Sequence, residues 1–186
     1  VKFNIKNVHY ALLNEGADGE VTWETPKKIP GAVSIALDAS GEISPFYADG
    51  IVYYQSSSNS GYEGDLEMAL ITDDFRVDVL KEEKDAKGVL IENANVETAK
   101  FALLFEFDGD QKATRHVLYN CTATRPSVEG ETTEDTKEPT TETLSISAAP
   151  LADGRVKAKT TAETDETAYN GWYQAVYETD SDLETE

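Results

Sequence analysis

The sequence has few of the side chains from which reactive sites are usually built. It contains one cysteine, one methionine and two histidines among 186 residues. The single Cys121 cannot form a disulfide within the chain, which argues against a secreted, disulfide-stapled scaffold. No glycine-rich phosphate loop and no His/Cys spacing typical of a metal site is present. We therefore expect no catalytic residues, no cofactor and no metal, and hence no enzyme.

Long apolar runs and basic residues are also scarce. No apolar run approaches the roughly 20 residues that span a bilayer, and no segment resembles a signal peptide, so we expect no membrane partner. The chain has 16 Lys and Arg against 36 Asp and Glu, a formal net charge of −20. A surface that grips nucleic acid needs clustered Lys and Arg. The acidic excess argues against such a surface, but it suits a protein that stays close to nucleic acid without binding it.

Alternating apolar and polar residues are the main structural signal. Residues 101–107, 116–123 and 143–148 each alternate with a period of two, which predicts three half-buried strands with one face on a core. Near Asn7 the alternation changes phase, which predicts a bulge or break in the first strand. Asp49-Gly50 predicts a turn between strands at 43–47 and 51–54. Similar patterns predict further strands at 20–23, 33–38, 62–71, 89–92 and 156–159.

One segment has the pattern of a helix. In TDDFRVDVLKEEKDAKG (72–88), Thr72 or Asp73 can cap the N-terminus, and Phe75, Val79 and Leu80 form an apolar stripe. We expect about three turns, packed against the sheet, because average helices have that length.

Two features near the middle and end of the chain have competing interpretations. Cys121 with His9 or His116 resembles a nucleophile and base, but a buried cysteine and a surface histidine explain them better. Tyr169, Trp172 and neighbouring aromatics suggest a plug, pinned to the core or to a neighbouring subunit, in preference to a sugar-binding platform. We could not assign the backbone of 167–177, because the Asn170-Gly171 turn interrupts helical spacing.

A long acidic loop joins the second and third of these strands. The loop at 127–142 has six carboxylates (Glu129, Glu131, Glu134, Asp135, Glu138 and Glu142) against one Lys137. Such a segment cannot collapse by itself, so its ordering needs a partner. We expect one domain, residues 1–178, which includes an N-terminal arm and this loop. Residues 179–186 form an acidic, flexible C-terminal tail.

Taken in order, these motifs resemble the major tail proteins of long-tailed, non-contractile bacteriophages of Gram-positive bacteria. The resemblance spans nearly the whole chain. It is carried by KFNIKNVHYALL, ITDDFRVDVLKEEKDAKGVLIE, residues 101–159 and YNGWYQAVY. Lys81-Glu82 departs from the family pattern, where a glycine and an aromatic are expected, so we expect the helix to run longer here.

The resemblance implies a fold and a role. The expected fold is mainly β: a two-sheet antiparallel β-sandwich or partial barrel with one flanking α-helix, the phage tail-tube fold. Six subunits would form a ring and the rings would stack into the tail tube, a conduit through which genomic DNA passes without specific binding. The implied location is the virion tail, assembled in the host cytoplasm, and the implied partners are further copies of the chain and the tape-measure and tail-terminator proteins.

We expect subunit contacts at two polar, extended segments and at several aromatics. The hypothesis is that the acidic loop and the N-terminal arm are the stacking elements, and that the bore is acidic or neutral. The candidate contact residues are Phe3, Ile5, Tyr10, Trp23, Glu131, Glu134, Asp135, Lys137, Glu138 and Trp172. Two other functions stay open: a monomeric carbohydrate-binding β-sandwich that uses Trp23 and Trp172, and a tail-terminator or connector ring that does not stack.

Overall fold

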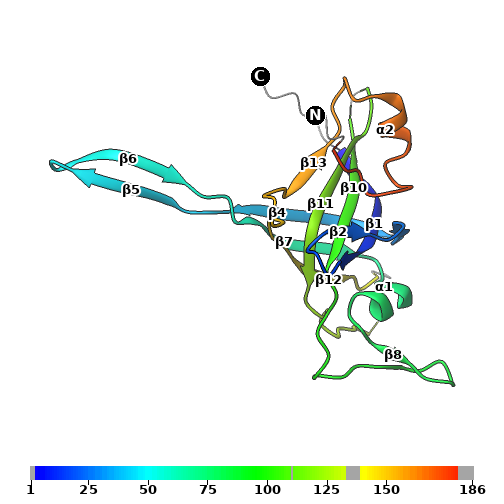
Figure 1. Ribbon diagram of the computed structural model, residues 1–186. Coiled ribbons are helices and arrows are strands. Elements are labelled where there is room, and N and C mark those ends of the chain that lie inside the picture. The colour runs from blue at the N-terminus through cyan, green and yellow to red at the C-terminus, as the bar shows by residue number, and fades with distance from the viewer. Residues whose placement is uncertain (1–2, 110, 133–138, 180–186) are drawn as a thin grey trace.

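The structure is a computed structural model that describes residues 3–109, 111–132 and 139–179. Its regular secondary structure is mainly β (Figure 1). The strands are β1 (Phe3–Glu15), β2 (Val21–Trp23), β3 (Lys27–Lys28), β4 (Ala32–Ser40), β5 (Ile43–Ala48), β6 (Ile51–Ser57), β7 (Gly61–Met68), β8 (Glu83–Lys84), β9 (Leu90–Ile91), β10 (Phe101–Asp108), β11 (Thr114–Ala123), β12 (Glu142–Ala148) and β13 (Lys157–Lys159). The helices are α1 (Asp73–Asp78) and α2 (Glu166–Asn170). The predicted mainly-β class is confirmed.

One antiparallel sheet folds over on itself to make a sandwich. Its strand order is β2-β1-β10-β11-β12-β7-β4, with β3 added to β1 and β13 added to β11. Along β11 the partner changes: residues 116–118 pair with β13, and residues 121–123 pair with β12. The sheet therefore splits at β11, and β12, β7 and β4 pass across β1 and β10. Leu66, Leu144 and Ile146 of one layer share a core with Phe101 and Leu103 of the other.

β10 is buried on both faces, where alternation predicted one buried face. Phe101, Leu103 and Phe105 point into the core between the layers. Ala102 and Leu104 point the other way, into a second core beneath the C-terminal segment. The prediction was wrong because the far-side residues of β10 are small or apolar, and a separate segment of the chain covers them.

β11 also differs from its predicted alternation. Leu118 and Cys121 lie in the same core, although they are three residues apart, while Tyr119 lies in the other core. The pairing with β10 shifts here, with Phe101 opposite Cys121 and Leu103 opposite Leu118. This is the geometry of a β-bulge, which inserts one residue and reverses the faces beyond it.

The predicted irregularity near Asn7 is confirmed. The β1–β10 register shifts between Lys6 and His9 and again between Phe3 and Ile5. Asn7 has φ 50° and Asn4 has φ 31°. Asparagine is among the few residues that enter this left-handed region readily, so the two positions suit the two bulges.

Helix α1 is shorter than predicted. It spans six residues, its N-cap Thr72 accepts a hydrogen bond from the Phe75 amide, and Val79 is its C-cap. Lys81 has φ 59°, which turns the chain towards the small β8–β9 hairpin. The expected three turns and the expected extension past Lys81-Glu82 are wrong, because Val79 and Leu80 are buried beyond the helix and direct the chain inwards.

The C-terminal segment contains a second short helix that sequence reasoning left unassigned. Asp165 caps α2 by accepting hydrogen bonds from the amides of Thr167 and Ala168. A turn at Gly171 follows, and the chain then continues along the sheet with Trp172 and Val176 buried.

Gly64 of β7 supplies a test of how closely β4 approaches β7. A Cβ at this position would lie 1.8 Å from the carbonyl oxygen of Ala36, so a side chain would push the strands apart. We expect Gly64→Ala to lower the free energy of unfolding by about 1–3 kcal/mol or more, the usual cost of overpacking. Urea denaturation measures it. Gly130→Ala is the control, because nothing lies within 4 Å of its added Cβ; equal stability of the two variants would contradict the prediction.

Candidate assembly surfaces

The strands β5 and β6 form a hairpin that projects far from the body of the molecule (Figure 1). Strand β4 leads directly into β5, and β6 leads back into β7, so the distal half of one long hairpin extends beyond the sandwich. Asp49 and Gly50 form its turn with φ of 51° and 79°. Positive φ at both central residues is typical of the type I′ turn, whose twist matches that of paired strands. The Asp49-Gly50 turn was predicted, but the projection was not.

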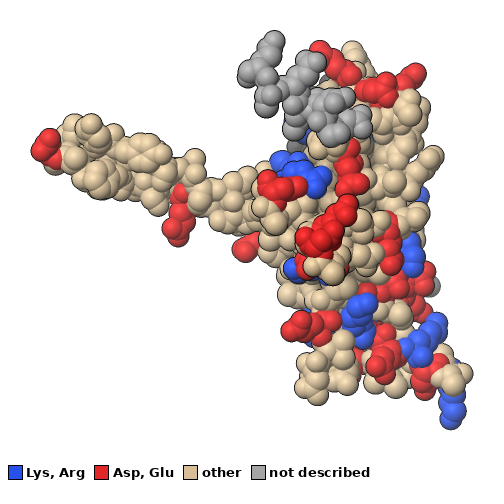
Figure 2. Space-filling model, in the orientation of Figure 1, with Lys and Arg blue, Asp and Glu red and all other residues tan. Residues whose placement is uncertain are grey.

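The hairpin is apolar on both faces and almost uncharged. Residues 43–57 include one charged residue, Asp49, in a chain of net charge −20. In Figure 2 the projection is mostly tan, whereas acidic and basic side chains cover much of the body. Seven of the twelve large apolar side chains that are exposed in the described part of the chain belong to it: Ile43, Phe46, Tyr47, Ile51, Val52, Tyr53 and Tyr54.

Such a surface calls for a partner. Contiguous exposed apolar patches mark interaction sites, and an isolated two-stranded hairpin is at best marginally stable in water. The sequence signal was available in ISPFYADGIVYYQSS, where both strands carry apolar residues on both faces. A run without alternation is also typical of a fully buried strand, so the pattern alone does not predict exposure.

The outward face of β4, β7 and β12 has the opposite character. The central row on β7 is Glu63, Asp65 and Glu67. Three hydroxyl side chains of β12 flank it on one side, and Ser34, Ala36 and Asp38 of β4 flank it on the other. Ser145 donates a hydrogen bond to Asp65 (3.0 Å), and Ser34 donates one to Glu67 (2.9 Å). Hydrogen bonds from Thr141 and Ser34 lower the pKa of Glu67, which keeps it ionised. We call this surface the acidic face; its residues are Ser34, Glu63, Asp65, Glu67, Thr143, Ser145 and Ser147.

The equivalent face of β1, β10 and β11 is covered by the C-terminal segment. Trp172 is buried there, donates a hydrogen bond from Nε1 to the carbonyl of His116 (3.3 Å), and stacks on Tyr177. Tyr119, whose pKa burial raises to about 12, donates to the carbonyl of Tyr177 (2.8 Å). The aromatic residues thus pin the C-terminal segment to the core of the same chain, which is one of the two predicted roles of the plug.

A buried ion pair holds this segment in place. Glu106 is 6% exposed and accepts hydrogen bonds from Arg115 Nε (2.9 Å), Asn7 Nδ2 (2.7 Å) and the Tyr173 hydroxyl (3.1 Å). Arg115 also donates to the carbonyl of Tyr169 in α2. Burial, and then the charge of Glu106, raise the pKa of Tyr173, so its hydroxyl keeps its proton and remains a donor. Because every partner is satisfied, this charge is tolerated inside the fold.

The residues considered as a nucleophile and base form no such site. Cys121 is fully buried, as predicted, and burial raises the pKa of its thiol to about 12. His116 is half-buried and stacks on Phe105, where a surface position was predicted. Within the described residues, no group of three or more His, Cys, Asp and Glu side chains is placed to hold a metal ion, and no helix is long and apolar enough to cross a membrane.

The ten residues predicted to contact other subunits fall into different environments. Tyr10 and Trp172 are buried, and Tyr10 donates a hydrogen bond to Asp78 (2.7 Å), so we no longer propose that their side chains meet another subunit. Ile5 and Trp23 are half-buried, and Glu131 is exposed. Phe3 begins β1. Glu134, Asp135, Lys137 and Glu138 lie outside the described residues, as does most of the tail at 179–186.

Comparison with known proteins finds similarity only among solved structures. No family model and no curated protein matches the chain. A cap structure of the anti-feeding prophage, described as its tube-terminating cap, is 10% identical, with 87% of this chain and 94% of that chain covered and a TM-score of 0.44. A component of the anti-feeding prophage baseplate structure is 13% identical over 88% and 97%, with a TM-score of 0.48.

A third solved structure, the sheath/tube terminator of an extracellular contractile injection system, is 10% identical over 83% of this chain and 94% of that chain, with a TM-score of 0.41. All three are parts of phage-tail-like injection particles. At these identities and scores the similarity assigns neither a family nor a function.

His9 gives the C-terminal segment a predictable response to pH. It stacks on Tyr173 at 4.4 Å between ring centroids, and burial, with Lys28 nearby, lowers its pKa below 6.5. The unfolded chain therefore takes up this proton at a higher pH than the folded chain. His9 does not change the free energy of unfolding well above pH 6.5, where it is neutral in both states, and it lowers that free energy as the pH falls from about 6.5 towards the folded pKa.

We expect wild type to lose more unfolding free energy than His9→Phe when the pH falls from 7.5 to 5.0. The phenyl ring keeps the stacking contact and cannot be protonated. Urea denaturation of both proteins at both pH values provides the comparison, which cancels the carboxylates that titrate in each. Equal losses would show that His9 does not contribute.

Proposed function

We propose that this chain is a structural subunit of a phage tail tube, which assembles with further copies into rings and stacks them into a conduit for DNA. The observation that carries the proposal is the β5–β6 hairpin: a long, almost uncharged, apolar projection that its own chain leaves exposed. Its composition suits burial between copies. The sequence resemblance to major tail proteins supports the same role independently.

The charge balance explains why the contact surface avoids carboxylates. A ring of six copies at −20 each would carry 6 × 20 = 120 negative charges. Electrostatic repulsion between copies of this charge opposes assembly. The repulsion is weakest where the contacting surfaces are apolar. The hairpin carries one carboxylate, Asp49, in residues 43–57, so this repulsion is weak there.

The acidic face is our candidate for the wall of the bore. It is an outward sheet face that the C-terminal segment leaves uncovered, and its side chains are carboxylates and short hydroxyls. Double-stranded DNA carries a negative charge about every 1.7 Å of its axis, so a basic wall would bind it. A wall of this composition repels it within a Debye length of about 8 Å, which lets DNA, or a tape-measure protein before it, pass without being held.

A stacked tube and a single terminator ring remain two forms of this proposal. The third possibility is a monomeric sugar-binding module, which would need exposed aromatic rings. Trp172 is buried, and Trp23 is half-buried and donates a hydrogen bond from Nε1 to the carbonyl of Tyr119 (3.0 Å), so neither ring is open as a platform. Negative-stain microscopy of concentrated protein distinguishes the three, which would give tubes, single rings or no assemblies. We expect tubes, in keeping with a tail subunit made in the host cytoplasm and incorporated into the virion.

The hairpin can be removed without disturbing the sandwich. The Ser58 amide already donates a hydrogen bond to the Glu42 carbonyl (2.9 Å), so Asn-Gly in place of residues 43–57 would close the strands with a two-residue turn. We expect this variant to fold, with β-sheet circular dichroism from the remaining strands and a cooperative urea transition, and to remain monomeric. The control replaces two other exposed apolar residues, Val89→Ser and Ile91→Ser, and should assemble as wild type does. Tubes from the shortened protein would refute the role of the hairpin.

Charge reversal on the acidic face tests the bore. We expect wild-type tubes assembled with short duplex DNA to leave it open to nuclease, and Glu63→Lys/Asp65→Lys tubes to protect it at low salt and release it at high salt. The control places the same reversals at Glu163 and Glu166, which are exposed beside α2 on the covered side of the sheet. DNA bound to the outside stays open to digestion. Protection by the control and not by the acidic-face variant would assign the bore to the other side.

A further inference from the structure

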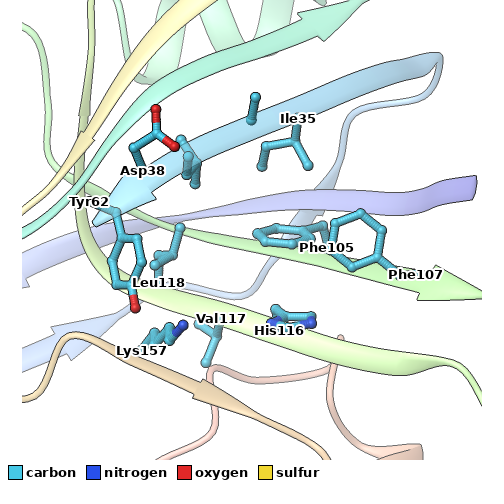
Figure 3. A pocket seen from close by; sticks show the side chains of 11 residues that line it. Ile35, Asp38, Tyr62, Phe105, Phe107, His116, Val117, Leu118 and Lys157 are labelled. Atoms are coloured by element: carbon cyan, nitrogen blue, oxygen red, sulfur yellow. The ribbon is translucent and has the colours of Figure 1, made fainter. Parts of the chain in front are cut away.

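An apolar groove lies along β4, where the sandwich stays open (Figure 3). Ile35 and Leu37 of β4 form one wall, and Phe105 and Phe107 of β10 form the other, over a volume of about 320 Å³. That space equals roughly ten water molecules at ~30 Å³ each. Lys157 of β13 stands at the rim, with its Nζ 4.4 Å from the centre of the Tyr62 ring.

The groove exists because β4 is the last strand of the sheet. In the described residues β4 pairs with β7 on one side and with no strand on the other. Ile35 and Leu37 therefore remain half-buried, although they pack against the main core. An unpaired edge strand beside apolar side chains is a surface that proteins normally cover. Nothing in the described part of the chain covers it.

The tip of the hairpin has side chains that suit this groove. Near its tip, Tyr47 and Val52 form a cross-strand pair, and both are exposed, as is Ile51. The only charge of the hairpin, Asp49, lies at the tip, and Lys157 is the cation at the rim of the groove. Among the described residues neither of these two side chains has an ion-pair partner, so the surfaces are complementary in polarity, and in charge at Lys157. The carboxylate that also lines the groove, Asp38, lies opposite Glu63 on β7.

The hairpin cannot enter the groove of its own chain. It continues the direction of β4 and β7 away from the sandwich (Figure 1), whereas the groove lies alongside β4 itself. The occupant must therefore come from a second copy.

We infer that the tip of the β5–β6 hairpin of one copy packs into the groove beside β4 of a second copy, with Tyr47, Ile51 and Val52 against the apolar walls and Asp49 next to Lys157. The inference rests on the proposed function, for which it supplies the surface that the hairpin meets. We take the contact as heterologous, with the hairpin of each copy in the groove of the next, because a tube needs contacts that continue from copy to copy. Repetition closes a ring or continues along a stack.

Disulfide trapping tests this contact directly. The double variant Val52→Cys/Leu37→Cys places one thiol at the exposed hairpin tip and one on the groove wall, where Leu37 is half-buried. The native Cys121 is buried and does not compete. Under mild oxidation of the assembled protein, we expect a ladder of covalent multimers on a non-reducing gel. The matched control, Val52→Cys/Ser145→Cys, moves the second thiol to the acidic face and should give no ladder, as should Val52→Cys alone.

A charge change at the rim adds a second readout. In the double-cysteine background, Lys157→Glu should lower the yield of the ladder several-fold by placing like charges together, and Lys157→Arg should keep it. Circular dichroism confirms that each variant is folded.

The outcomes separate this inference from the proposed function. Tubes or rings that form without a ladder, or with as much ladder in the Ser145 control, would overturn the groove contact and leave the proposed function intact. A wild-type protein that stays monomeric at high concentration would overturn both.

Discussion

The fold depends on β10 being buried on both sides. Its odd-numbered residues Phe101, Leu103 and Phe105 support the core between the layers, and Ala102 and Leu104 support the core beneath the C-terminal segment. A strand covered on both faces offers a partner little surface, except near its end, where Phe105 and Phe107 line the groove beside β4. The two covered faces therefore leave the acidic face, the edge strand β4 and the hairpin as the regions where other molecules can meet this chain. The Glu106–Arg115 pair keeps this arrangement by fixing the C-terminal segment over the second core.

The distribution of charge separates these remaining surfaces. Carboxylates and hydroxyls lie on the outward side of β4, β7 and β12, where water or a passing polyanion can be accommodated without binding. The hairpin has a single carboxylate in fifteen residues. In an acidic chain, such a segment is the place where two copies approach at the least electrostatic cost, since the Coulomb repulsion between exposed charges fades beyond about 8 Å at physiological salt. Repulsion elsewhere then favours this contact over unspecific ones.

Much of the local structure could be predicted from sequence, and the exceptions have physical causes. The kink at Asn7, the Asp49-Gly50 turn and the alternation of β12 are short-range signals, and the structure contains all three. The length of α1 was wrong because burial of Val79 and Leu80 outweighs the helix propensity of the residues that follow. The bulge in β11 was not predicted because residues 118–121 include no glycine or proline, which would have marked an irregularity in the strand. Of the site, the acidic composition was predictable, but the groove was not, since it requires β4, β10 and β13 to come together.

The hairpin also shows how an exposed apolar element can avoid aggregation. A long flat edge of this kind is a template for unwanted strand pairing. Pro45 lies within β5 and cannot donate a ladder hydrogen bond, and Asp49 places a charge at the tip. Together they disfavour simple edge-to-edge addition of another strand while leaving the side chains of Tyr47, Ile51 and Val52 free to enter a shaped pocket. A hairpin built in this way selects a partner that offers an apolar groove with a nearby cation, which is what the open side of β4 provides.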